Sequence, residues 1–210
     1  MSDGYGADEV RSALVRTAEA LRENADAFTR LDQALGDGDL GITARKVADA
    51  LVAHAEGASP DEDLGAFIAA AGMATNRAAS STMGTLLATA GMRAGKLVKG
   101  AARLTDVQLT AMLQAAAEGM RERGKASLGD KTILDALFPA TEAFAAALEA
   151  GMPVEAAGRA MVRAAEEGRD AVTPLRNKIG RAGWIGERTE GLVDPGCELC
   201  VVVLRALARA

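Results

Sequence analysis

Alanine recurring at helical spacing is the feature that most constrains the fold of this 210-residue chain. The sequence holds 47 alanines but only 5 prolines, and alanine favours the α-helix more than any other residue. Apolar residues recur every three or four positions through residues 7–29, as in a helix that buries one face. Aromatic residues make up only 3% of the chain, so the core must be built from aliphatic side chains. The sequence therefore predicts an all-α protein.

Helix start signals and polar breaks divide the chain into about eight expected helices. Capping boxes begin at Ser59 and Thr105, Asp130 is placed to cap another helix, and Pro153 and Pro195 suit first helical turns. The expected helices span residues 7–29, 43–56, 59–75, 83–98, 105–121, 130–148 (with a bend expected at Pro139) and 153–172, with a last one from 195. Short connections favour one domain over residues 1–210, an antiparallel helical bundle or barrel.

Charge and hydropathy exclude several classes of partner. The chain has 24 Lys+Arg against 29 Asp+Glu and a net charge of −5, without a long basic run, so nucleic acid is not an expected partner. No uninterrupted apolar stretch is long enough to cross a bilayer, and the polar start Met1-Ser2-Asp3-Gly4 does not resemble a signal peptide. We therefore expect a cytoplasmic protein without a membrane partner.

The two cysteines and the single histidine are expected to have packing roles. Cys197 and Cys200 form a C-x-x-C pair, but no strand pattern supports a redox site and no further ligands support a zinc site. Their spacing places both on one face of a helix, as for two reduced core residues. His54 lies inside an expected helix and matches no motif, which favours a surface or boundary position.

The densest polar signal is the stretch Leu31-Asp32-Gln33-Ala34-Leu35-Gly36-Asp37-Gly38-Asp39-Leu40-Gly41, which predicts a loop. Its carboxylates, Asp32, Asp37 and Asp39, are hard oxygen ligands of the kind that Mg²⁺ prefers, and glycines between them allow a tight fold. With phosphate oxygens they could hold two ions roughly 3.5–4 Å apart. The order differs from that of an EF-hand, and a polar turn with capping aspartates remains the alternative.

Four further polar breaks are weak signals one by one. The run from Asn76 to Thr85 is either an anion site at a helix N-terminus or an ordinary cap. The others contain Arg123-Gly124-Lys125 with Gly129-Asp130-Lys131-Thr132, then Gly180-Arg181-Ala182-Gly183 with Gly186-Glu187-Arg188, and finally Asp194-Pro195-Gly196.

Together these motifs, in this order, resemble the nucleotide-binding L subunit of dihydroxyacetone kinases, the DhaL family. The resemblance runs from about Leu31 to the C-terminus and implies a closed barrel of eight helices with ADP or ATP and two Mg²⁺ ions at one end. It implies Asp32, Asp37 and Asp39 as metal ligands. The implied nucleotide contacts are Leu40, Gly41, Ile42 and Thr43, then Ser80 and Ser81, Gly124 and Ile133 around the adenine, Arg181, and the turn Asp194, Pro195 and Gly196.

Two positions depart from the family pattern. Leu40 stands where histidine is common, so it is not expected to serve as a base. The loop from Ala78 to Gly84 holds less glycine than the family loop, and an alanine Cβ there can block the approach of a phosphate to the backbone.

The resemblance implies a kinase subunit that is active only with a partner. The acceptor would be a short ketose held on a separate K-type sugar-binding subunit, and no base for its hydroxyl is identified on this chain. A phosphocarrier protein is a second candidate partner. The alternatives are a kinase subunit for another acceptor (a tetrose or a carrier-bound fatty acid), a relay in which bound ADP passes on a phosphoryl group from a phosphotransferase-system protein, and a non-catalytic, nucleotide-loaded regulator.

Overall fold

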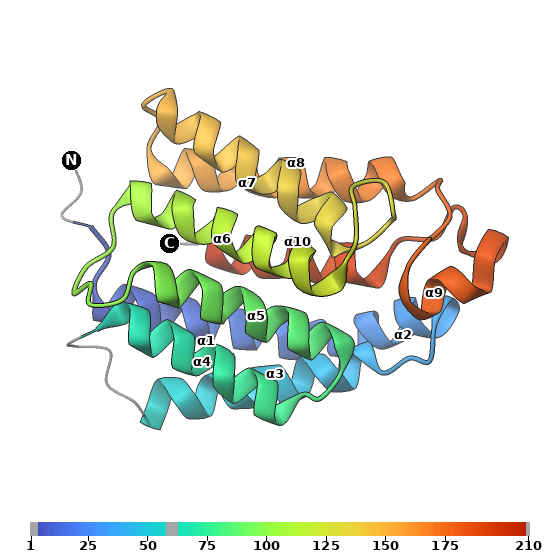
Figure 1. Ribbon diagram of the computed structural model, residues 1–210, viewed down its shortest axis with the longest axis horizontal. Helices are drawn as coiled ribbons and strands as arrows, with labels where there is room; N and C mark the ends of the chain where they lie inside the picture. Colours follow the sequence, from blue (N-terminus) through green and yellow to red (C-terminus); the bar gives the residue numbers. More distant parts are fainter. Residues whose placement is uncertain (1–3, 58–62, 209–210) are drawn as a thin grey trace.

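Long helices make up most of the protein, and from α3 to α8 each runs opposite to the one before it (Figure 1). The computed structural model describes residues 4–57 and 63–208, and within them it contains ten α-helices, one short 3₁₀ helix and no strand. The α-helices are α1 (Ala7–Glu23), α2 (Ala25–Leu35), α3 (Leu40–Gly57), α4 (Leu64–Ala78), α5 (Thr82–Leu97), α6 (Asp106–Gly124), α7 (Ile133–Glu149), α8 (Val154–Val172), α9 (Gly180–Ile185) and α10 (Pro195–Leu207), with the 3₁₀ helix η1 at Gly186–Thr189. The all-α prediction is confirmed.

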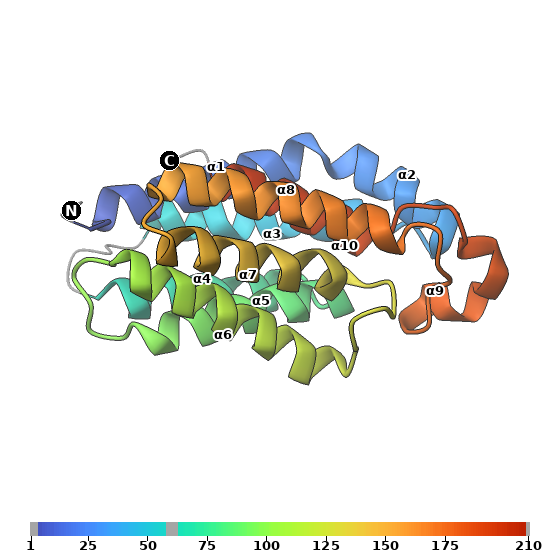
Figure 2. The same ribbon diagram turned by 90° about the horizontal axis from the view of Figure 1, so that it is seen from above.

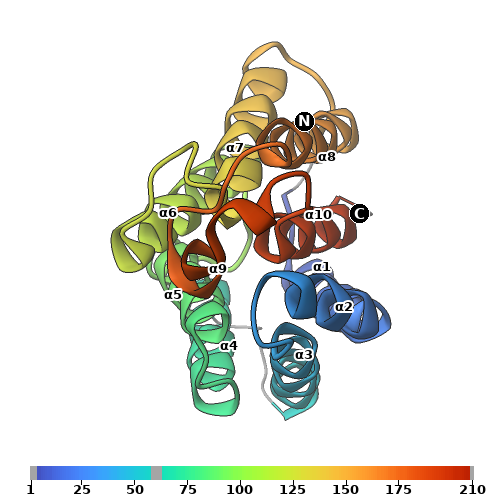
Figure 3. The same ribbon diagram turned by 90° about the vertical axis from the view of Figure 1, so that its right-hand side faces the viewer.

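Eight of these helices pack in sequence around a common long axis. Contacts join α1 to α3 and then continue from each helix to the next one in the chain, from α3 as far as α8. The last helix, α10, packs against both α8 and α1 (Figure 3). Seen from above, they run side by side along the length of the molecule (Figure 2). Whether this arrangement is the closed barrel of the family stays a prediction.

The alternation of direction gives the two ends of the molecule different electrostatic character. α3, α5, α7 and α10 all begin at the end that lies on the right in Figure 1. A helix N-terminus carries about half a positive charge from its aligned peptide dipoles. Four such N-termini therefore face the connections at this end, which include residues 36–39, 79–81, 125–132 and 173–194.

Small residues allow the helices to approach closely around an aliphatic core. Between α4 and α5, a Cβ on Gly65 or Gly95 would lie 2.5 Å from backbone atoms of the facing helix or of the residues that follow it. Phe28 is fully buried, and the other fully buried large side chains are mostly leucines. None of the described helices is both long and apolar enough to cross a membrane.

The structure corrects the predicted N-terminal helix and the loop after it. The expected helix over residues 7–29 is interrupted at Asn24, whose side-chain amide donates to the Ala20 carbonyl 2.8 Å away. The chain then continues as α2 to Leu35, so Asp32 lies in the last turn of a helix rather than in a loop. α3 begins at Leu40 instead of residue 43, because the Asp39 carbonyl already accepts from the Thr43 amide at 2.9 Å.

Other helix ends agree with the sequence in part. The capping box at Thr105 is confirmed, although α6 extends three residues beyond the predicted end to Gly124. The capping box predicted at Ser59–Glu62 lies outside the described residues, and α4 is capped by Asp63, whose carboxylate accepts from the Ala66 amide at 2.8 Å. α4 also runs to Ala78, into the predicted polar break. α8 follows Pro153 as predicted.

The cap of α7 is Thr132, not Asp130 as predicted. Lys131 has a left-handed backbone with φ of 61°, so the chain is not helical before Thr132. Asp130 instead organises the preceding loop, where its carboxylate accepts from the Ser127 amide at 2.8 Å. α7 continues from Ile133 to Glu149 with Pro139 inside it.

Residues 173–193, predicted to be irregular, contain α9 and η1, and a buried lysine bonds to three of their carbonyl groups. The Lys131 ammonium donates to the carbonyls of Thr173 (2.9 Å), Leu175 (2.9 Å) and Thr189 (2.6 Å). Lys131 is fully buried, and this burial lowers the pKa of its ammonium. Asn177 extends the network, since its amide donates to the Lys131 carbonyl at 2.7 Å.

Replacing Lys131 by Met should loosen this segment. The substitution keeps the apolar stem but leaves three carbonyls without their charged donor, so we expect the free energy of unfolding to fall by about 3 kcal/mol. Hydrogen exchange of the amides in residues 173–193 should accelerate more than that of α4 or α5. Lys178→Met is the matched control, because that side chain is exposed and its ion pair with Asp130 is worth less than about 1 kcal/mol. Equal losses in both variants would contradict the assigned role.

The cysteine pair and the histidine occupy the positions predicted for them. Cys197 and Cys200 are free and buried in α10, and the Cys197 thiol lies 2.9 Å from the Thr132 carbonyl oxygen. Burial raises the pKa of both thiols, that of Cys200 to about 12. His54 is half-buried in α3, where its Nε2 lies 2.9 Å from the Phe67 carbonyl oxygen and its ring lies over that of Phe67.

These thiols should be inert in the folded protein. A thiol-specific reagent is expected to modify neither Cys197 nor Cys200 at neutral pH until the chain is unfolded, because reactivity requires an exposed thiolate. The double substitution to Ala should lower the free energy of unfolding by only about 1–2 kcal/mol, measured by denaturant titration. Rapid modification of the native protein would contradict the packing role.

Candidate functional site

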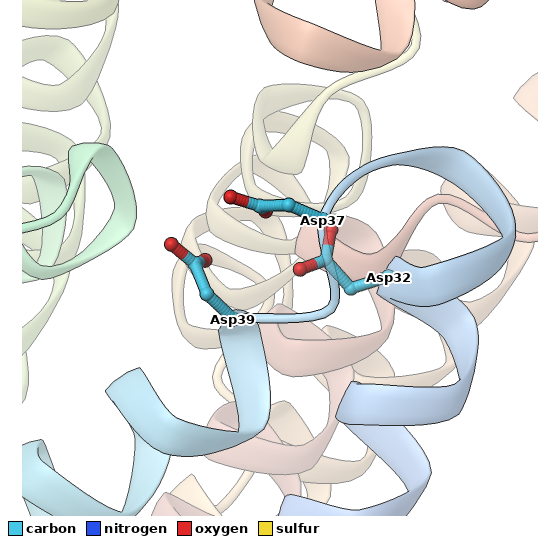
Figure 4. Close-up of side chains that lie close together, drawn as sticks. All are labelled: Asp32, Asp37 and Asp39. Carbon is cyan, nitrogen blue, oxygen red and sulfur yellow. The ribbon is translucent and has the colours of Figure 1, made fainter.

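Three carboxylates converge where α2 passes into α3 (Figure 4). Asp32 comes from the last turn of α2, Asp37 from the connection, and Asp39 from the residue before α3. One carboxylate oxygen of each lies within 4.8 Å of the others. Gly38 makes the reversal between them possible, since its φ of 76° is one that residues with a side chain rarely adopt. The loop geometry predicted from the glycine spacing therefore brings the three aspartates together.

The aspartate cluster holds three carboxylates, and Arg181 and Lys46 act on it as cations. Burial, followed by the charge of Asp32, raises the pKa of Asp39, while Lys46 opposes this shift. Asp32 is held in place by the Leu40 amide, which donates to its Oδ2 at 3.0 Å. Arg181 reaches the cluster from α9, where it forms an ion pair with Asp37 and lies 3.5 Å from Asp39. Oxygen ligands at this spacing, with net negative charge, suit a hard divalent cation.

The N-terminus of α5 faces the same end of the molecule. The Ser81 hydroxyl caps this helix by accepting from the Gly84 amide at 3.0 Å, and it also accepts from the Thr43 hydroxyl at 3.0 Å. Thr43 and Ser81 thus join the first turns of α3 and α5, although neighbouring Ser80 is exposed.

A cavity of about 230 Å³ lies between the aspartates and the N-termini of α5, α7 and α10. The residues implied by the family resemblance that line it are Asp32, Asp37, Asp39, Leu40, Ser81, Gly124, Ile133, Arg181, Asp194, Pro195 and Gly196. Gly41, Ile42, Thr43 and Ser80 are not among its lining residues. Ile42 is 56% exposed, while a Cβ on Gly41 would overlap the Ala25 carbonyl oxygen. Gly41 therefore serves the close packing of α3 on α2.

The start of α10 forms the floor of the cavity. The buried Asp194 carboxylate accepts from the Cys197 amide at 2.9 Å and from the Asn177 side-chain amide at 2.9 Å. Burial raises the pKa of Asp194. A Cβ on Gly196 would lie 3.1 Å from the Met83 methyl group and 3.4 Å from Ile133, so glycine keeps this part of the cavity open.

Sequence reasoning missed several lining residues. Met83, Leu86 and Met120 give the cavity an apolar wall, although in the sequence they look like ordinary core positions of α5 and α6. Lys131 and Asn177 line the cavity from the buried network, and among the described residues the Oδ1 of Asn177 has no hydrogen-bond partner. The motif around Lys131 was visible in the sequence. The burial of the Lys131 side chain was not, because the carbonyl groups that accept from its ammonium belong to residues more than forty positions later in the chain.

The arrangement combines a cation site, a positive helix end and an apolar slot. Three carboxylates can hold a divalent cation, and the N-termini of α5, α7 and α10 favour an anion beside it. The apolar wall can take a flat hydrophobic group. A metal-bound phosphate ester with a ring system is the class of ligand that this geometry suits.

Comparison with known proteins identifies the family to which the chain belongs. Residues 34–209 match the DAK2 domain family. The chain is 30% identical over 201 residues to the ADP-binding subunit DhaL of the PEP-dependent dihydroxyacetone kinase of Escherichia coli, covering 94% of this chain and 93% of that protein. It is 32% identical to the corresponding subunit of kinase 2 of Listeria innocua, with 90% of each chain covered.

Larger proteins contain a similar region. A D-erythrulose kinase of Mycolicibacterium smegmatis is 32% identical across 97% of this chain, which spans 35% of that enzyme. The crystal structure of the dihydroxyacetone kinase of C. freundii has the same fold over 97% of this chain, with a TM-score of 0.74 at 22% identity, and this chain spans 35% of it. Because the match extends through nearly the whole chain, the protein belongs to the DAK2 domain family and is a relative of the DhaL subunits of PEP-dependent dihydroxyacetone kinases.

Proposed function

We propose that residues 1–210 form one nucleotide-binding domain, the ADP- or ATP-binding subunit of a dihydroxyacetone-kinase-like phosphotransferase of the cytoplasm. Its phosphoryl group would pass to a hydroxyl of a short ketose held by a separate K-type subunit. The observation that carries the proposal is the cluster of Asp32, Asp37 and Asp39 at the edge of a cavity faced by helix N-termini. The names of the relatives, which are ADP-binding kinase subunits and ketose kinases, support the same reading.

The proposed metal site follows from the donor set. Asp32, Asp37 and Asp39 would hold two Mg²⁺ ions together with phosphate oxygens, and they fit these ions because all three are hard oxygen ligands within reach of one another. Bound Mg²⁺ would neutralise charge on the β- and γ-phosphoryl oxygens during transfer. Arg181 would then move from Asp37 to the phosphates, where its guanidinium can pair with oxygens in two places.

The rest of the cavity would orient the nucleotide. Gly124 and Ile133 would lie against the adenine, together with the apolar wall formed by Met83 and Leu86. Leu40 at the start of α3, Ser81 at the start of α5, and Asp194, Pro195 and Gly196 at the start of α10 would contact the phosphates and ribose. Four of the implied contact residues lie outside the cavity wall, namely Gly41, Ile42, Thr43 and Ser80. They would contribute to nucleotide binding through the helix N-termini of which they form part or which they precede.

No base for the acceptor hydroxyl is proposed on this chain. Leu40, where the family commonly has histidine, is apolar and buried, and His54 lies in α3 away from the cavity, hydrogen-bonded to α4. The partner subunit would therefore both hold the ketose and accept its proton. Transfer requires the hydroxyl to be aligned with the phosphoryl group, which a freely diffusing sugar does not provide.

One observation favours a second candidate, in which ADP is a tightly bound cofactor. The chain covers 90% or more of two relatives named as ADP-binding subunits of PEP-dependent kinases, but only about a third of the erythrulose kinases. In this case a phosphocarrier protein, and not free ATP, would donate the phosphoryl group. ADP that remains bound through gel filtration, with no turnover of free ATP, would favour this candidate.

Substitutions of Arg181 and Asp37 should separate the metal site from the nucleotide site. Arg181→Ala removes a cation that competes for the aspartates, so we expect nucleotide-free protein to bind Mn²⁺ roughly threefold to tenfold more tightly. The same variant should bind Mg·ADP about tenfold more weakly, because a charged hydrogen bond to phosphate is lost. Asp37→Asn should weaken the binding of both Mn²⁺ and Mg·ADP, while the helix content of the protein stays unchanged. Calorimetry in which Arg181→Ala moves both affinities in the same direction, or in which Asp37→Asn binds Mg·ADP normally, would contradict the assignment.

Turnover should depend on the partner. Purified chain with Mg·ATP and a panel of short ketoses is expected to yield sugar phosphate only when the K-type subunit of the same organism is added. His54→Ala should leave this activity unchanged, since His54 packs on Phe67 outside the cavity. Sugar phosphate formed by the isolated chain and abolished by His54→Ala would show that a complete kinase is present here.

A further inference from the structure

The most exposed large apolar side chain in the described part of the protein is a tryptophan beside the cavity. Trp184, in α9, is 91% exposed and is the single tryptophan of the chain. Tryptophan is largely buried in most proteins, because leaving so much apolar surface in water is unfavourable. The fold gains almost no packing from it, which points to a role outside the folding of this chain.

The position of Trp184 is tied to the aspartate cluster by helix geometry. It follows Arg181 by three residues in α9, and side chains at this spacing are neighbours on a helix surface. Arg181 contacts Asp37 and Asp39 and lines the cavity, so Trp184 is the neighbour on α9 of a residue at the metal end of the cavity. In Figure 3, α9 stands in front of the other helices, and three of its residues, Gly180, Arg181 and Ala182, line the cavity.

Other features of residues 173–193 resemble the surroundings of a docking anchor. Leu175 is 43% exposed and Leu192 is 38% exposed in the same segment. Arg176 forms exposed ion pairs with Glu187 at 2.9 Å and Glu190 at 3.2 Å. Apolar anchors enclosed by a polar, charged rim are typical of protein interfaces, and tryptophan is enriched among the residues that dominate their energy.

We propose that Trp184 is the anchor by which this chain docks the subunit that carries the phosphoryl acceptor. The inference rests on the proposed function. A protein that brings an acceptor to a phosphoryl group held at Asp32, Asp37 and Asp39 would come close to α9, because Arg181 of that helix contacts the aspartates and lines the cavity. The acceptor subunit, and not a second copy of this chain, is therefore the proposed occupant.

The intrinsic fluorescence of the protein tests this directly, because one tryptophan supplies the signal. We expect the emission of the free chain to be that of a tryptophan in water and to be quenched by iodide. Adding the K-type subunit of the same organism, carrying tryptophan-to-phenylalanine substitutions and loaded with dihydroxyacetone, should shift the emission to the blue and protect it from iodide. A shift that appears on concentrating this chain alone would overturn the proposal in favour of self-association.

Kinetics of substituted chains complete the test. Trp184→Ala should raise the KM for the K-type subunit by about 30-fold, with kcat at saturating partner and the Kd for Mg·ADP both unchanged. Trp184→Phe should fall between Trp184→Ala and the parent chain. Val107→Ala is the matched control, because Val107 is 79% exposed in the first turn of α6, a helix that begins at the opposite end of the molecule. The KM of this variant for the K-type subunit should equal that of the parent chain. An unchanged KM in Trp184→Ala overturns this inference alone, whereas a parent chain that yields no sugar phosphate with the partner overturns the proposed function.

Discussion

Mutual repulsion of three carboxylates is the constraint around which one end of this protein is built. One carboxylate oxygen from each of Asp32, Asp37 and Asp39 lies within 4.8 Å of the others, and like charges at that distance repel one another. Helices that reverse direction along the chain place the N-termini of α3, α5, α7 and α10 at the same end. These positive helix ends and Arg181 offset the repulsion in the absence of a cation. The topology thus supplies the electrostatics before any ligand is bound.

The site also depends on a contact that holds Arg181 beside the aspartates. The helix that carries Arg181, α9, has only six residues, and none of them is buried. A short exposed helix has little stability of its own. Its position depends on Lys131, whose buried ammonium collects carbonyls from both sides of it at Thr173, Leu175 and Thr189. Asn177 joins the same lysine to Asp194 at the start of α10. One charged group therefore links the stability of the segment to the geometry of the site.

Local patterns were sufficient for much of this arrangement. The alanine-rich 3.6-residue periodicity predicts the helices, and the Asp-x-Asp spacing with its glycines predicts the convergence of the carboxylates. The break at Asn24 was not predictable, because the apolar repeat continues in α2 with nearly the same phase. The buried Lys131 was hidden for another reason. Its partners are defined by tertiary structure, and sequence statistics place lysine at the surface.

The loop before α5 shows how a departure from a family pattern is accommodated. From the sequence, an alanine Cβ in this glycine-poor loop was expected to obstruct a phosphate. In the structure Ala79 is buried, and its Cβ faces Gly84. A Cβ added to Gly84 would lie 2.8 Å from the Cβ of Ala79. Ala79 is not a lining residue of the cavity, whereas Ser81 is. The glycine that this turn requires is therefore at position 84, where the first turn of α5 closes over the alanine, and the capping hydroxyl of Ser81 stays at the cavity wall.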